Sequence, residues 1–175
     1  SVVKIFIQVS RGLSAAHAKG IIHRDIKPAN LLLVSEMVAQ SDPLVKIVDF
    51  GIASLHSEKR TDYPLDASPL LHAQSQSDSL LGGAQTSGGE IFGSPLYMSP
   101  EQFSGQNLTG ATDIYSCGCA LFEALTGAPP FFGPTAFATM NLHLNQIAPS
   151  VSSRLLDVEI PQRLEGLLSR MLAKE

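Results

Sequence analysis

The 175-residue sequence predicts a mainly α-helical fold, a helical bundle with one small β-hairpin. Two observations carry this prediction. Apolar residues recur at helical spacing in several separate stretches, whereas short β-favouring runs stand out at two places that are close together in the chain. With 44% hydrophobic residues, the chain can bury a substantial core within the size range of one domain.

The first half of the chain predicts a helix followed by the hairpin. Residues 2–19 have the apolar spacing of an amphipathic helix, and Gly20 follows as a left-handed C-terminal cap. Residues 31–34 and 45–48 are the two β-favouring runs, and a polar stretch with Pro43 separates them. An antiparallel hairpin of these runs would place the residues before the first strand beside those after the second.

The middle of the chain predicts a long loop and then a capped helix. Between residues 54 and 90 the pattern dissolves into Ser, Gln, Gly and Asp, which predicts a flexible insert. Ser99, Pro100 and Gln102 have the order of an N-cap, a first helical residue and a capping-box partner. A short helix should therefore begin at Pro100.

Three further helices are predicted towards the C-terminus. Residues 113–126 are apolar nearly all round and should be buried on most sides, and Gly127 ends them. A helix from about residue 134 would group Phe137, Met140 and Leu144 on one face. After Pro161 the apolar stripe consists of Leu164, Leu167, Leu168, Met171 and Leu172.

Charge and cysteine content exclude several classes of function. A net charge of −4 gives no cationic surface for binding nucleic acid, and no apolar run reaches the length of a membrane span. Cys117 and Cys119, two apart in one helical pattern, cannot bridge each other, so we expect reduced core residues and a cytoplasmic location. The histidines show no spacing typical of metal ligands.

Two motifs carry the functional signal. Residues 23–30 read His-Arg-Asp-Ile-Lys-Pro-Ala-Asn, and residues 48–51, at the end of the second β-run, read Val-Asp-Phe-Gly. The predicted hairpin would bring Asp25, Asn30 and Asp49 together, although they are far apart in the chain. Phosphoryl transfer needs reactants that are positioned and phosphate charge that is neutralised, and these side chains suit both demands.

These motifs resemble the catalytic loop and metal-binding turn of serine/threonine protein kinases of bacterial type. The resemblance extends through almost the whole chain, because residues 93–101 are similar to the end of the kinase activation loop and Asp113 matches the aspartate that begins the central helix. It implies the C-terminal lobe of a protein kinase, with ATP and Mg²⁺ as cofactors and proteins carrying Ser or Thr hydroxyls as substrates.

The resemblance also implies roles for individual residues. Asp25 would accept the proton of the substrate hydroxyl, and Lys27, which favours the serine/threonine class, would contact the transferred phosphoryl group. Asn30 and Asp49 would hold magnesium, for which oxygen ligands are suited. Leu32 lies where the family places an apolar residue beneath the adenine ring, although an ordinary strand leucine explains it equally well.

Other matches concern regulation and the substrate groove. Arg24 would grip a phosphate on the activation loop, with Thr86 and Ser87 as candidate acceptors. The position where many relatives place the acceptor holds Glu90, whose carboxylate would partly replace the phosphate. Ser94 would bond Asp25 and Lys27 from the substrate groove.

Four residues are expected to support the site. His23 would pack against Phe50 and do no acid–base work, while Asp113 would accept hydrogen bonds from the catalytic-loop backbone. Glu101 would lack the arginine that relatives place just beyond Glu175.

The chain departs from the family at its start. The glycine-rich phosphate loop, strand lysine and helix glutamate of the N-terminal lobe are missing. We therefore expect residues 1–175 to be a partial kinase domain, truncated and inactive in isolation. Two alternatives stay open: a non-catalytic docking module, and a small-molecule phosphotransferase, against which residues 93–101 argue.

Overall fold

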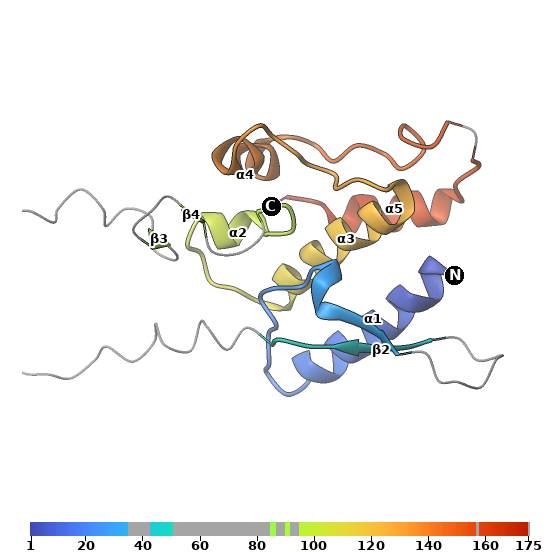
Figure 1. Ribbon diagram of the computed structural model, residues 1–175, viewed down its shortest axis with the longest axis horizontal. Coiled ribbons are helices and arrows are strands. Elements are labelled where there is room, and N and C mark those ends of the chain that lie inside the picture. The colour runs from blue at the N-terminus through green and yellow to red at the C-terminus, as the bar shows by residue number, and fades with distance from the viewer. Residues whose placement is uncertain (35–42, 51–84, 87–89, 92–94, 157, 175) are drawn as a thin grey trace, which may run out of the picture. The chain divides into compact units, whose positions relative to one another are not determined.

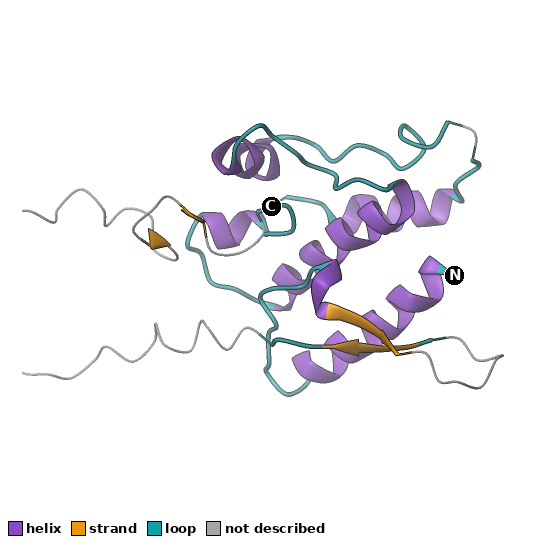
Figure 2. Cartoon of the chain, in the orientation of Figure 1, coloured by secondary structure: helices purple, strands orange, loops and turns teal. Residues whose placement is uncertain are grey.

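The computed structural model describes residues 1–34, 43–50, 85–86, 90–91, 95–156 and 158–174. The chain divides into one unit of Ser1–Gly51 with Gly93–Glu175 and a second unit of Ile52–Phe92. Helices are the main secondary structure in the described part of the first unit, and a two-stranded antiparallel sheet accompanies them, as Figures 1 and 2 show. The prediction of a mainly helical fold with a small hairpin is confirmed.

The first helix, α1, covers Val2–His17 and buries Phe6, Val9 and Leu13. Gly20, with a φ of 72°, closes it as predicted. The Gly20 amide donates to the His17 carbonyl at 2.9 Å and the Ile21 amide to the Ala16 carbonyl at 3.0 Å. This pair of bonds is a Schellman motif, which satisfies carbonyls at the helix end and turns the chain towards residues 23–30.

The hairpin pairs β1, Leu31–Val34, with β2, Leu44–Ile47, one residue earlier than predicted for the second strand. Their register places Leu31 opposite Ile47. Helix α1 packs on β2, and a Cβ at Gly12 would lie 3.0 Å from Ile47 Cδ1, so glycine allows this close approach. Gln8 adds a polar link, because its Oε1 accepts from the Val45 amide at 3.1 Å.

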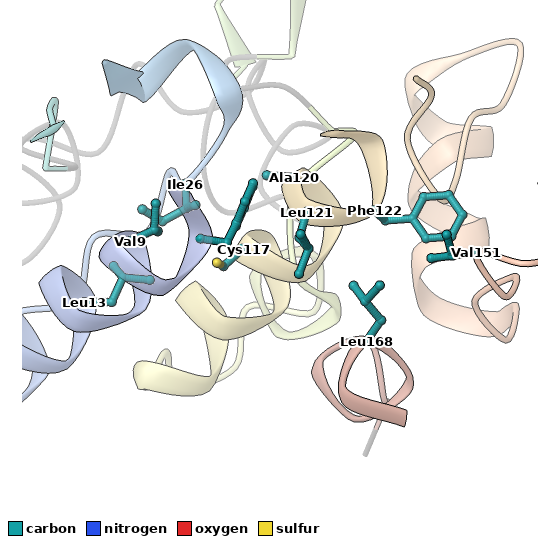
Figure 3. Close-up of a cluster of buried hydrophobic side chains, with 10 residues drawn as sticks. Val9, Leu13, Ile26, Cys117, Ala120, Leu121, Phe122, Val151 and Leu168 are labelled. Carbon is teal, nitrogen blue, oxygen red and sulfur yellow. The ribbon is translucent and has the colours of Figure 1, made fainter. Parts of the chain in front are cut away.

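Helix α3, Gly110–Thr126, is the centre of the first unit and packs against both α1 and α5. It begins three residues before the predicted start because the Thr109 hydroxyl caps it, accepting from the Ala111 amide at 3.2 Å. Gly127 ends it with a φ of 81°, as predicted. Figure 3 shows side chains of α3 meeting those of α1, the Ile26 segment and α5 in one core cluster.

Besides a 3-10 helix at Pro28–Asn30, the described chain has three shorter α-helices: α2 covers Pro100–Phe103, α4 covers Ala136–Asn145 and α5 covers Gln162–Met171. Leu168 and Leu172 from the predicted stripe are buried, whereas Leu167 is 42% exposed. Between residues 54 and 90, where a loop was predicted, β3, Gln85–Thr86, pairs with β4, Glu90–Ile91. Residues 54–84 and 87–89 lie outside the described part, so their predicted flexibility stays a prediction.

The predicted face of α4 does not point into the core. Phe137 is 77% exposed, whereas Thr139 and His143 are the buried residues of this helix. Polar contacts explain the difference. The Gly133 amide donates to Thr139 Oγ1 at 3.0 Å, and His143 Nδ1 shares a 2.9 Å hydrogen bond with the Tyr115 hydroxyl of α3. These hydrogen bonds help both side chains to enter the core, although the buried His143 Nε2 has no hydrogen-bond partner among the described residues.

The two cysteines are free and buried, as predicted. Burial and, secondarily, the charge of Asp113 raise the pKa of Cys117 to about 12, and burial also raises the pKa of Cys119. Both thiols therefore behave as small apolar core groups. Among the described residues, no helix has both the length and the apolar character needed to cross a membrane.

Replacing Phe122 should destabilise the fold strongly. This side chain is 1% exposed in the main core cluster, so Phe122→Ala should lower the free energy of unfolding by about 3–5 kcal/mol. Phe137→Ala is the matched control, because Phe137 is 77% exposed, and should cost under about 0.5 kcal/mol. Urea denaturation measures both, and equal losses would contradict this packing.

The buried His143 should make stability depend on pH. Burial, helped by the Lys174 charge, lowers the pKa of His143 from 6.5 to about 4. Between these values the unfolded chain binds a proton that the folded chain excludes, so stability falls as the pH falls, by up to about 1.4 kcal/mol per pH unit. Urea denaturation from about pH 7.5 to 4.5 should show a steeper loss in the unmodified protein than in His143→Phe. Parallel curves would be the contrary result.

Candidate active site

The loop of residues 23–30 is held at the N-terminus of α3 by the buried carboxylate of Asp113. This side chain is 0% exposed. Its Oδ2 accepts from the His23 amide at 2.8 Å and its Oδ1 accepts from the Arg24 amide at 2.8 Å. Asp113 lies in the first turn of α3, where the helix dipole favours a negative charge. One carboxylate thus joins the central helix to the loop that carries Asp25.

A third partner of Asp113 comes from α1. His17 Nε2 lies 2.7 Å from Asp113 Oδ2, a role that the sequence did not predict for this histidine. A Cβ at Gly110 would lie 2.8 Å from His17 Nδ1, so the absence of a side chain there leaves room for the ring. His17 and Asp113 are 96 positions apart, and this contact had no local signal in the sequence.

His23 holds two ends of the site together through its imidazole ring. Its Nε2 lies 2.9 Å from the Val48 carbonyl, and its Nδ1 accepts from the Asp25 amide at 3.3 Å. The neutral tautomer with hydrogen on Nε2 satisfies both bonds. The ring is 0% exposed and its centroid lies 4.5 Å from that of Phe50, so His23 is a packed support.

Asp25, Lys27 and Asn30 meet in one cluster. Lys27 Nζ lies 2.8 Å from Asp25 Oδ2. Asn30 Nδ2 donates to the Asp25 carbonyl at 2.8 Å and to Asp25 Oδ2 at 3.2 Å. The Asp25 side chain is 40% exposed, while Asn30 is 4% exposed. The Asp25 carboxylate is therefore held in place and still accessible to solvent. Asn30 orients it through the amide nitrogen, so these bonds do not use the Asn30 amide oxygen.

The hairpin brings the backbone of Asp49 to the same cluster. The Val48 amide donates to the Asn30 carbonyl at 3.0 Å, which extends the β1–β2 pairing by one step. The next residue, Asp49, has a φ of 57°. Arg24, with a φ of 69°, is the other non-glycine residue with positive φ in the described chain. Such backbone costs free energy and persists where surrounding bonds hold it.

Two further predicted residues have described side chains. Leu32, opposite Lys46 on the hairpin, is 48% exposed and so is not an ordinary buried strand leucine. Glu101 was expected to lack its arginine partner, which stays a prediction; in the structure the Thr112 hydroxyl donates to Glu101 Oε1 at 2.8 Å. This bond joins α2 to the first turn of α3.

The regulatory and groove residues are less fully described. Thr86 on β3 pairs with Glu90 on β4. Ser87 and Ser94 lie outside the described residues. The predicted contacts of these four residues stay predictions.

The described residues contain no group of three or more His, Cys, Asp and Glu side chains that could form a metal centre alone. Asn30 and Asp49 nevertheless offer amide and carboxylate oxygens at neighbouring ends of the hairpin. A hard cation such as Mg²⁺ is commonly held by one or two such protein ligands together with substrate phosphates and water. The donor set therefore fits a cation that arrives with a phosphate-bearing ligand.

Comparison with known proteins gives consistent matches. A family profile described as "Protein kinase domain" matches residues 1–175. The chain is 35% identical over 173 residues to the probable serine/threonine-protein kinase PknB of Lactococcus lactis, covering 99% of this chain and 22% of that protein. It is 36% identical over 173 residues to the serine/threonine-protein kinase pkn3 of Myxococcus xanthus, covering 99% of this chain and 28% of that protein. The chain thus spans under a third of either relative.

Asp113→Asn should loosen the loop of residues 23–30. The amide keeps one oxygen but replaces the other with a donor group, which leaves a buried backbone N–H without a partner. The expected cost is about 2–3 kcal/mol in the free energy of unfolding, with faster hydrogen exchange at the His23 or Arg24 amide. Glu159→Gln, the same change at an exposed carboxylate, is the control. Unchanged exchange at both amides would refute the role given to Asp113.

Proposed function

The chain belongs to the protein kinase family, and we propose that it is the catalytic lobe of a serine/threonine protein kinase that transfers the γ-phosphoryl group of ATP to protein hydroxyls. The observation that carries the proposal is the Asp25 carboxylate, held jointly by Lys27 and Asn30 and still open to solvent. The names of the bacterial relatives support the serine/threonine class.

Asp25 has the position and exposure of a group that receives a substrate hydroxyl. Its oxygens can orient the attacking hydroxyl and accept its proton. Lys27 has its ammonium 2.8 Å from this carboxylate, so it can neutralise charge on the phosphoryl group next to the same hydroxyl. Because Asn30 holds both the backbone carbonyl and the carboxylate of Asp25, each by one hydrogen bond, little reorganisation is needed when the substrate arrives.

Mg²⁺ would be held by Asn30 and Asp49, and when bound it supplies positive charge against the phosphates. The Asn30 amide nitrogen donates two hydrogen bonds to Asp25, which leaves the amide oxygen as the natural metal ligand. Asp49 follows Val48, whose backbone is bonded to both His23 and Asn30. The half-exposed Leu32 suits an apolar contact with the adenine ring.

The remaining roles follow from the family resemblance. Arg24 would order the activation segment by binding phosphate on Thr86 or Ser87, or the carboxylate of Glu90 in place of phosphate. Ser94 would link the substrate groove to Asp25 and Lys27. The buried free thiols suit a cytoplasmic catalytic lobe.

Activity is proposed for the longer polypeptide that contains this lobe. A glycine-rich loop, a strand lysine and a helix glutamate normally complete the nucleotide site, and none of the three occurs in residues 1–175. Each missing interaction worth about 1.4 kcal/mol in the transition state costs a factor of ten in rate. The lobe alone should therefore transfer phosphate at background rates.

Asp25→Asn tests the proposal in that longer polypeptide. The amide keeps the shape of the side chain but cannot accept the hydroxyl proton, so kcat should fall by about 10²- to 10⁴-fold with the KM for ATP little changed. Transfer from radiolabelled ATP to peptides with one Ser, Thr or Tyr acceptor measures both the rate and the substrate class. Glu159→Gln is the control. Equal rates for Asp25→Asn and the unmodified protein would contradict the proposal, as would transfer confined to Tyr peptides.

A further inference from the structure

Gln102 connects helix α2 to the loop that carries Asp25. Its Nε2 donates to the Arg24 carbonyl at 2.8 Å across 78 positions of sequence. Its Oε1 accepts from the Ser99 amide at 3.0 Å and from the Ser99 hydroxyl at 3.3 Å. One side-chain amide therefore caps α2 with its oxygen and binds the neighbouring loop with its nitrogen.

The capping role does not require a glutamine. At this third helical position, glutamate completes a capping box as well as glutamine does, because only an acceptor oxygen is needed. Glutamine differs by its NH₂ group, which donates to the Arg24 carbonyl. The choice of glutamine is thus explained by the contact with the loop and not by the cap.

The peptide group that Gln102 binds is the one that leads into Asp25. Arg24 has a φ of 69°, a conformation that costs free energy for a residue with a side chain. Its amide is held by Asp113 and its carbonyl by Gln102. The Arg24 carbonyl and the Asp25 amide share one peptide plane, and that amide donates to His23 Nδ1 at 3.3 Å. Releasing the carbonyl would let this plane rotate, and Asp25 would rotate with it.

We propose that Gln102 is a positioning residue that sets the orientation of Asp25 from helix α2, so that the segment around residues 95–103 is coupled to the catalytic carboxylate. The predicted effect of Gln102 on the reaction rate rests on the proposed function. The predicted effect of Gln102 on the backbone of Asp25 is independent of that function.

Gln102→Glu is the diagnostic change, made in the longer polypeptide that contains this chain. The variant keeps the acceptor for Ser99 and loses the donor to Arg24. We expect its melting temperature to stay within about 2 °C of the unmodified protein, while kcat falls about tenfold or more with an unchanged KM for ATP. Gln106→Glu adds the same charge at an exposed site four positions away and is the control. A kcat within about twofold of the unmodified value would overturn the proposal.

A double-mutant cycle separates positioning from an independent effect. Because Gln102 acts through Asp25, Gln102→Glu should change the residual rate of Asp25→Asn by less than about twofold. If Gln102→Glu lowered the rate of the Asp25→Asn variant by the same factor as it lowers the rate of the unmodified protein, the proposal would be overturned.

Hydrogen exchange tests the same contact without any activity. In Gln102→Glu the Asp25 amide should exchange about tenfold faster, while the Ser99 amide stays protected by the retained cap. Unchanged exchange at Asp25 would overturn the positioning role even in an active kinase. Absence of any Asp25-dependent transfer in the unmodified protein would instead reject the proposed function and leave the exchange result to decide on Gln102.

Discussion

The site depends on one buried carboxylate. Asp113 is 0% exposed, and it receives hydrogen bonds from the His23 and Arg24 amides and from the His17 ring. Burying a charge is costly unless charged or hydrogen-bonding partners compensate it, and these partners come from two other parts of the fold. The carboxylate can therefore be buried only when α1, α3 and the loop of residues 23–30 are in their native arrangement. Folding and the geometry of the site are consequently linked through one residue.

That link allows the loop to hold strained backbone. Arg24 and Asp49 both have positive φ, and hydrogen bonds hold the backbone at each position. The Arg24 amide donates to Asp113 and the Arg24 carbonyl accepts from Gln102. Asp49 follows Val48, whose amide donates to the Asn30 carbonyl. The His23 ring connects the two turns by contacting both Val48 and Phe50. The Asp25, Lys27 and Asn30 side chains are thereby fixed relative to the hairpin, which lowers the reorganisation that catalysis would require.

The sequence predicted the parts of this arrangement that local patterns encode. The first helix with its Gly20 cap, the hairpin predicted for residues 31–34 and 45–48 and observed at Leu31–Val34 and Leu44–Ile47, and the capped start of α2 follow from periodicity, turn residues and capping. The tertiary partners had no such signal. His17 and Gln102 are separated by 96 and 78 positions from the residues they bond, and both have ordinary local explanations. The buried face of α4 was missed because hydrophobicity cannot anticipate that Tyr115 offers His143 a partner.

The central claim is that this scaffold brings Asn30 and Asp49 to a shared divalent cation beside Asp25. The most direct measurement is a crystal structure of the longer polypeptide with Mn²⁺ and a non-hydrolysable ATP analogue, in which anomalous scattering locates the metal. We expect a metal ion within about 2.0–2.2 Å of both the Asn30 amide oxygen and an Asp49 carboxylate oxygen, with the nucleotide phosphates completing its coordination. A metal bound elsewhere, or these two oxygens too far apart to share a cation, would contradict the account.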